Sequence, residues 1–211
     1  HQKAAHATES KYFDREILPV EGKNAEGIND LVMADEGIRF DASLDKLAGL
    51  NPVTEGGVIT AGNASQITDG AAAVMVCNDA GLKKIKASPR AEIVSISVVG
   101  DDPVFMLTGP IPASFKALES ANLSIEDMDL YEVNEAFAPV PLAWAADLKA
   151  DRSKLNVNGG AMALGHPLGA TGAKLMTTLL HEMERRESTY GLQAICEGGG
   201  TANATIIKRI S

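Results

Sequence analysis

Residues 156–172 read N-V-N-G-G-A-M-A-L-G-H-P-L-G-A-T-G, in which five glycines surround one histidine, His166. Glycine has no side chain, so a backbone rich in glycine can turn tightly and approach a bound molecule closely. Gly165 and Pro167 flank the histidine directly, and proline restricts the local backbone. A histidine held in such a loop is a candidate for proton transfer or for stabilising an oxyanion.

Two further short motifs place polar or reactive side chains beside small residues. N-E-A-F occupies residues 134–137, and C-E-G-G-G occupies residues 196–200. Each has an ordinary structural interpretation, because Asn134 could cap a helix and Cys196 could be a buried core thiol. We interpret the three motifs together as one active site built from three loops, with Asn134, His166 and Cys196 as its reactive groups.

The apolar pattern from residue 65 onward is typical of an α/β domain. The β-branched residues 92–99 predict a strand, and the apolar run 71–76 predicts a buried strand followed by a buried Cys77. Apolar residues at helical spacing predict a helix over residues 169–186. The other expected elements are helices at 79–87, 111–121 and 138–149, a capped turn at 124–127, and strands at 129–133, 193–196 and 205–209.

The first part of the chain has a different character. It opens with a helical pattern, continues with a strand-like segment at residues 16–20, and then has a charged, loop-like stretch at residues 24–41. Such a segment is expected to form loops and caps rather than a core of its own. We therefore divide the chain into residues 1–64 and residues 65–211. The chain begins with His1 and shows no signal for the start of its first helix, so we expect it to be part of a longer protein.

Composition narrows the classes of partner. The chain has 28 acidic and 19 basic residues, a formal net charge of −9, which argues against nucleic acid. No apolar run has the length of a membrane span, so no membrane partner is expected. Two cysteines, Cys77 and Cys196, are too few for a disulfide scaffold and favour a reducing, cytoplasmic setting. Neither His166 nor Cys196 has the clustered spacing of metal ligands, so no metal is expected.

Five motifs in this order resemble the C-terminal part of the thiolases, the acetyl-CoA acyltransferases. Besides N-E-A-F, G-H-P and C-E-G-G-G, they are A-G-N-A-S-Q-I-T-D-G at residues 61–70 and M-L-T-G-P-I-P-A at residues 106–113. The resemblance implies a layered α/β thiolase fold. Residues 65–211 would be the C-terminal core domain with one βαβαβαββ unit, and residues 1–64 the remainder of the CoA-binding loop domain.

The resemblance also implies roles for the residues of the three motifs. His166 would activate a nucleophilic cysteine and help to bind the thioester oxygen. Cys196 would move a proton at the α-carbon of the acetyl group. Asn134 would hold a water in a first oxyanion hole, and the N–H of Gly198 would form part of a second. The family's nucleophilic cysteine belongs to an N-terminal half absent from this chain, so the isolated chain is expected to be inactive.

Six further residues match positions that contact the substrate in the family. They are Ser65 and Ala61 along the CoA channel, Arg39 near the nucleotide, Met106 beside the acyl group, and Ala136 and Phe137 beside the pantetheine arm. The expected activity of the parent protein is acyl transfer between acyl-CoA and CoA, either thiolysis of a 3-ketoacyl-CoA or Claisen condensation. CoA would be a substrate, with no separate cofactor, and the intact protein would be a homodimer or homotetramer.

Three other functions remain open from the sequence. The glycines of residues 159–172 could cradle a phosphate at a helix start, although no G-x-G-x-x-G follows a strand in the required register. The chain could instead be a non-catalytic CoA-binding or scaffold subunit of a thiolase-like complex. Finally, Cys196, His166 and Asn134 could form a cysteine hydrolase in which Cys196 itself carries the acyl group.

Overall fold

The computed structural model describes residues 1–23 and 26–210. Within these residues, the main sheet has four strands in the order β3–β6–β5–β4. They are β3 (Ala91–Gly100), β4 (Leu130–Val133), β5 (Tyr190–Cys196) and β6 (Thr201–Arg209). β6 pairs antiparallel with both β3 and β5, whereas β5 and β4 are parallel. The carboxyl ends of β4 and β5 therefore lie at the same edge of the sheet.

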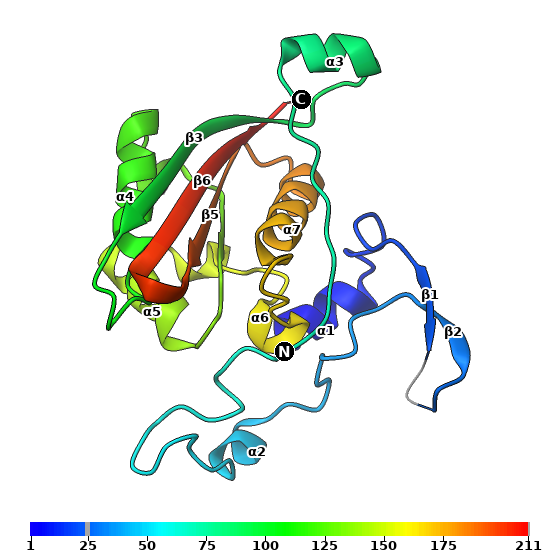
Figure 1. Cartoon of the computed structure of the whole chain (residues 1–211), viewed down its shortest axis with the longest axis vertical. Coiled ribbons are helices and arrows are strands. Elements are labelled where there is room, and N and C mark those ends of the chain that lie inside the picture. Colours follow the sequence, from blue (N-terminus) through cyan, green and yellow to red (C-terminus); the bar gives the residue numbers. More distant parts are fainter. Residues whose placement is uncertain (24–25, 211) are drawn as a thin grey trace.

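Helices cover both faces of this sheet (Figure 1). α4 (Pro110–Ala121) and α5 (Pro139–Asp147) lie on one face, and α7 (Thr171–Arg185) packs against β4 and β5 on the other. The shorter helices are α1 (Gln2–Glu9), α2 (Leu44–Ala48), α3 (Asp79–Ile85) and α6 (Ala161–Leu164), with 3-10 turns η1 (Ile125–Asp127), η2 (Arg152–Lys154) and η3 (Gly198–Gly200). β1 (Val20–Lys23) and β2 (Asn29–Val32) form a separate antiparallel pair.

The main apolar core lies between the sheet and helices α4 and α5. Trp144 is completely buried there and contacts Tyr131 edge to face, with 5.3 Å between ring centroids. Its indole N–H donates to Ser114 Oγ at 2.8 Å, and Ser114 Oγ donates to the Pro110 carbonyl at 2.7 Å. The buried polar atoms of Trp144 and Ser114 are thus paired, as a well-packed interior requires.

A second cluster attaches the first residues of the chain to the glycine-rich loop. Ala4 and Ala7 of α1 pack with Phe13, Ile38 and Leu164, so that α1 lies against α6. Gly159 has a φ of +88°, and a Cβ at that position would lie 2.7 Å from Ala4 Cβ. Glycine is therefore required here both by the backbone conformation and by the approach of α1.

Most expected elements from residue 79 onward are confirmed, as is the α/β class. The helices at 79–87, 111–121, 138–149 and 169–186 begin and end within two residues of their predicted bounds. The strands at 92–99, 129–133, 193–196 and 205–209 are also present, the last two being longer than predicted. The capped turn forms as expected, because Ser124 N–H donates to Asp127 Oδ2 at 2.8 Å.

The expectation of a buried strand at residues 71–76 was wrong. These residues form no strand, and Val74, Met75 and Val76 are 41%, 76% and 69% exposed. Cys77 is exposed as well, so it is not a core thiol. An extended segment becomes a strand only when a neighbouring edge satisfies its backbone groups, and within the described residues no strand pairs with this one.

The N-terminal strand was predicted in the wrong place. It begins at Val20 rather than Glu16, because the backbone N–H of Glu16 donates to the Phe13 carbonyl and its side chain is held by α7. The stretch 24–41 contains β2 as well as loop, and residues 24 and 25 of that prediction lie outside the described residues.

Replacing Trp144 tests the assignment of the main core. We expect Trp144→Ala to lower the free energy of unfolding by about 3–5 kcal/mol, since it empties a buried site and leaves Ser114 without its donor. Phe115→Ala is the matched control on α4, where the side chain is 50% exposed, and should cost less than about 1 kcal/mol. Urea unfolding of the protein that contains this chain measures both, and equal costs would contradict the assignment.

Candidate active site

His166 lies in the loop between α6 and α7, and its backbone is tightly held. The N–H of His166 donates to the Gln66 carbonyl at 3.0 Å. Gly165 has a φ of +80°, and a Cβ there would lie 2.2 Å from Thr68 Oγ1. Glycine before the histidine is therefore needed for the backbone turn and for the contact with residues 66–68.

The imidazole of His166 takes part in a chain of hydrogen bonds. Thr171 Oγ1 donates to the Pro167 carbonyl at 3.0 Å, which leaves the hydroxyl oxygen to accept from His166 Nδ1–H at 2.6 Å. With the ring proton on Nδ1, Nε2 is the acceptor, and it lies 3.3 Å from Asn134 Nδ2. This arrangement leaves Nε2 as the basic nitrogen of a neutral ring.

Two effects lower the pKa of His166 below its usual value. Partial burial of the ring is the larger one, because it disfavours the charged imidazolium. The positive charge of Lys174 acts in the same direction. The imidazole is therefore neutral at physiological pH and able to accept a proton.

Asn134 is held at the carboxyl end of β4. Its N–H donates to the Ala194 carbonyl of β5 at 3.0 Å, and its side chain is 1% exposed. Within the described residues, its buried Oδ1 has no hydrogen-bond partner. Asn134 does not cap α5, because that helix begins at Pro139 with Ala138 as its cap. The structure thus removes the alternative interpretation that the sequence had left open.

Glu135 joins the N-E-A-F loop to the glycine-rich loop. One carboxylate oxygen accepts from Asn156 Nδ2 at 2.8 Å and the other from the Met162 N–H at 3.1 Å. A Cβ at Gly160 would lie 2.2 Å from this carboxyl group, so only glycine leaves room for it.

Cys196 closes β5, where it pairs with Ala202 of β6. Its side chain is 7% exposed, and burial raises the pKa of the thiol. Gly198 is exposed and opens the glycine turn, in which Gly199 and Gly200 have φ values of +78° and +84°. Because β4 and β5 are parallel neighbours, Cys196 and Asn134 lie at the same edge of the sheet.

The structure also brings together three of the expected CoA contacts. Ser65 N–H donates to the Ala136 carbonyl at 3.0 Å, and Ala64 forms an antiparallel bridge with Phe137. Ser65, Ala136 and Phe137 therefore lie together where two short segments pair, and residues 136–137 follow Asn134 closely in the chain.

The other three expected contacts lie in separate loops. Arg39 is exposed and lines a surface groove formed by residues 36–41 and Gln66. Met106 is half-buried in the loop between β3 and α4, which contacts the glycine turn because Asp101 N–H donates to the Gly200 carbonyl. Ala61 is exposed in the turn before Asn63.

Two residues that hold the site were missed by the sequence reasoning. Thr171 lies in the glycine-rich run 156–172, only five residues after His166, so the sequence could have suggested its contact with the imidazole. Gln66 gave no such signal, since its side-chain partners Gly37 and Met162 lie 29 and 96 residues away in the chain. Its side-chain amide donates to the carbonyls of Gly37 and Met162 at 2.8 Å and 2.9 Å, which links the Arg39 groove to the histidine loop.

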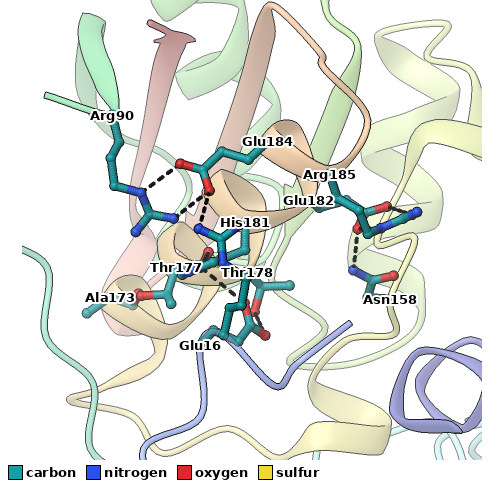
Figure 2. Close-up of polar contacts among 11 residues, drawn as sticks. Glu16, Arg90, Asn158, Ala173, Thr177, Thr178, His181, Glu182, Glu184 and Arg185 are labelled. Atoms are coloured by element: carbon teal, nitrogen blue, oxygen red, sulfur yellow. Dashed lines mark hydrogen bonds and ion pairs between the residues drawn. The ribbon is translucent and has the colours of Figure 1, made fainter. Parts of the chain in front are cut away.

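Helix α7 carries a band of polar and charged contacts along its flank (Figure 2). Thr178 Oγ1 donates to Glu16 Oε1 at 3.1 Å, and His181 Nδ1 lies 2.9 Å from the Thr177 carbonyl and 3.5 Å from Glu16 Oε2. Burial raises the pKa of Glu16 to about 7. These contacts, which include those of His181, anchor the segment after α1 to α7.

Searches of the described residues for two other kinds of site gave no candidates. No group of three or more His, Cys, Asp or Glu side chains there is arranged to hold a metal ion. None of the helices in this part of the chain has the length and apolar character needed to cross a membrane.

Comparison with known proteins gave consistent matches. The family model described as "Thiolase, C-terminal domain" matches residues 87–209, and that described as "Thiolase, N-terminal domain" matches residues 1–80. A steroid 3-ketoacyl-CoA thiolase of Mycobacterium tuberculosis is 53% identical over 210 residues, which are 100% of this chain and 50% of that protein. An acetyl-CoA acetyltransferase of Synechocystis is 45% identical over 99% of this chain and 53% of its own length.

Solved structures agree with this result. The acetyl-CoA acetyltransferase of Bacillus anthracis superposes with a TM-score of 0.94 at 43% identity, over 100% of this chain and 53% of that one. Human mitochondrial 3-ketoacyl-CoA thiolase in complex with CoA gives a TM-score of 0.89 at 40% identity, over 99% of this chain and 52% of that one. The chain thus spans about half the length of the relatives it matches. On this evidence, the chain belongs to the thiolase family.

Proposed function

We propose that the protein containing this chain transfers acyl groups between acyl-CoA and CoA, by thiolysis of a 3-ketoacyl-CoA or by the reverse Claisen condensation. The observation that carries the proposal is the contact of 3.3 Å between Asn134 Nδ2 and His166 Nε2 at the sheet edge where β5 delivers Cys196. A neutral imidazole, a buried carboxamide and a protonated thiol in one place suit general acid and base chemistry on a thioester.

In this mechanism, His166 Nε2 takes the proton of a nucleophilic cysteine that lies outside these 211 residues. The resulting thiolate attacks the 3-keto carbon of the 3-ketoacyl-CoA, and a covalent acyl-cysteine forms as the bond between C2 and C3 breaks. The electron pair of that bond stays on the departing acetyl-CoA fragment, and Cys196 supplies the proton for its α-carbon. CoA then attacks the acyl-cysteine as its thiol proton passes to the Cys196 thiolate, and the shortened acyl-CoA leaves as His166 returns its proton to the departing cysteine sulfur.

The remaining site residues would bind rather than react. The unpaired Oδ1 of Asn134 suits a bound water that, with His166, stabilises the thioester oxyanion. The N–H of Gly198 would serve the second oxyanion. Ser65, Ala136 and Phe137 would line the pantetheine channel, with Ala61 nearby, Met106 beside the acyl group and Arg39 toward the nucleotide.

We also propose how the chain is organised around these roles. Residues 1–64 would be the remainder of the CoA-binding loop domain, and residues 65–211 the C-terminal core domain. The intact protein would be a homodimer or homotetramer in the cytoplasm, with CoA as substrate and no metal. Since a relative at 53% identity is a steroid 3-ketoacyl-CoA thiolase, the substrate panel should include ring-bearing thioesters as well as short and long chains.

The first test separates Cys196 from the acyl carrier. We expect Cys196→Ala to lower kcat by about 10²–10⁴-fold, because a positioned acid and base is lost, while acetyl-CoA still acylates the protein. Cys77→Ala is the matched control, since Cys77 is exposed and lies outside the site, and it should change neither rate nor labelling. Intact mass followed by peptide mapping locates the label. Acylation of Cys196 itself would support a cysteine hydrolase instead.

The second test uses the charge state of His166. The neutral imidazole is the active form, and its pKa is lowered by burial and by the charge of Lys174. We therefore expect kcat/KM to stay constant as the pH falls to about 6.5 and to decline only below that value. The pH dependence of kcat/KM measures this limb, with Trp144 fluorescence recorded at each pH to detect unfolding. A decline that begins well above the usual pKa of histidine would contradict the assignment.

The third test concerns the chain by itself. We expect the 211-residue chain to cleave no acetoacetyl-CoA, because it would lack the nucleophile. The same chain preceded by a segment equivalent to the remaining half of its relatives should be active. Thiolysis by the 211 residues alone would show that no further cysteine is needed, and would contradict the mechanism.

A further inference from the structure

Lys174 lies on the first turns of α7, three residues after the threonine that holds the His166 ring. Its ammonium group donates to the Leu164 carbonyl at 3.1 Å, and Leu164 is two residues before the histidine. Helix α7 therefore holds the histidine loop at two points, through Thr171 on the imidazole and through Lys174 on the backbone.

The carbonyl that Lys174 binds belongs to a strained and crowded part of the loop. Gly165, the next residue, has a positive φ of +80° and packs against Thr68. A turn of this kind keeps its conformation only when neighbouring groups fix it. The contact from Lys174 to Leu164 supplies one of these restraints, two residues before His166, whose side chain faces Asn134.

Four carboxyl groups from different parts of the chain act electrostatically on the ammonium group of Lys174. Burial lowers the pKa of Lys174, and the carboxyl groups of Asp35, Glu132, Glu16 and Glu135 act against this lowering without cancelling it. Glu16 is fixed on α7 by Thr178 (Figure 2). Glu132 is 2% exposed on β4, and burial keeps its pKa well above the usual value. Lys174 thus belongs to a cluster of ionisable groups that spans the N-terminal segment, the sheet and α7.

We propose that Lys174 is a positioning residue for His166, which fixes the Leu164 carbonyl and places a positive charge near the imidazole. A nearby cation opposes protonation of the ring, in the same direction as burial. Lys174 thereby keeps Nε2 free to accept a proton. Only the kinetic consequence of this role rests on the proposed function, because the charge state of the ring can be measured without turnover.

The test compares variants that remove or keep the charge in the protein that contains this chain. Lys174→Met removes the ammonium and retains the length of the side chain, whereas Lys174→Arg keeps a cation. Lys116→Met is the matched control, because Lys116 also donates to a backbone carbonyl, that of Val98 at 3.1 Å, but is exposed on α4. Histidine labelled with ¹³C at Cε1 reports each imidazole pKa by NMR, and His166→Asn identifies the His166 signal.

We expect the pKa of His166 to rise by about 0.5 or more in Lys174→Met and to stay near its original value in Lys174→Arg and Lys116→Met. The acid limb of kcat/KM should move to higher pH by the same amount in Lys174→Met alone. An unchanged His166 pKa in Lys174→Met, or an equal rise in Lys174→Arg, would overturn the proposal.

Two further measurements keep these outcomes distinct. If Lys174→Met does not fold, Lys174→Met combined with Asp35→Asn removes a cation and an acidic neighbour together, which is better tolerated than leaving one charge unpaired. The same rise in the pKa of His166 is expected there, and its absence counts against the role of Lys174. Absence of thiolysis in the unsubstituted protein would count against the proposed function alone, since the NMR titration still tests Lys174.

Discussion

The carboxylate of Glu135 is the contact on which the arrangement of the site depends. It accepts hydrogen bonds from Asn156 Nδ2 and from the Met162 N–H, and so binds the end of β4 to the loop that leads to His166. Asn156 also bonds both backbone groups of Val133. A buried carboxylate is stable only when such donors are present, so the two loops and the charge fix one another. Asn134 and His166 meet as a result.

The two faces of the sheet serve different purposes. Beneath α4 and α5 the core is apolar, and its few polar atoms around Trp144 are paired. Beneath α7 the interior contains Glu132, Lys174 and Glu16, whose pKa values are shifted by burial. Buried charges stabilise a fold poorly compared with apolar packing, but they control the protonation of neighbouring groups. The face that carries them is the one against which the histidine loop rests.

Local sequence predicted most of the elements because periodic apolar residues report which side of a helix or strand is buried. The helix at α7 and the strand at β3 illustrate this. The same reasoning failed at residues 71–76, where the apolar run is right for a strand but no edge pairs with it among the described residues. A strand forms only when an extended segment pairs with a neighbouring segment, whereas the apolar pattern describes only one of the two.

The sequence by itself determined the three motifs, their order, the α/β class and the glycines that the loops need, since each depends on local conformation or on residue chemistry. It left the role of Asn134 undecided between a helix cap and a site residue, and it gave no sign of the contacts made by Gln66, Lys174 or Glu132. Those contacts join residues far apart in the chain, up to about a hundred positions for Gln66 and Met162. Only the packing of α7 and residues 63–68 around the loop, which no local pattern encodes, could bring them to His166.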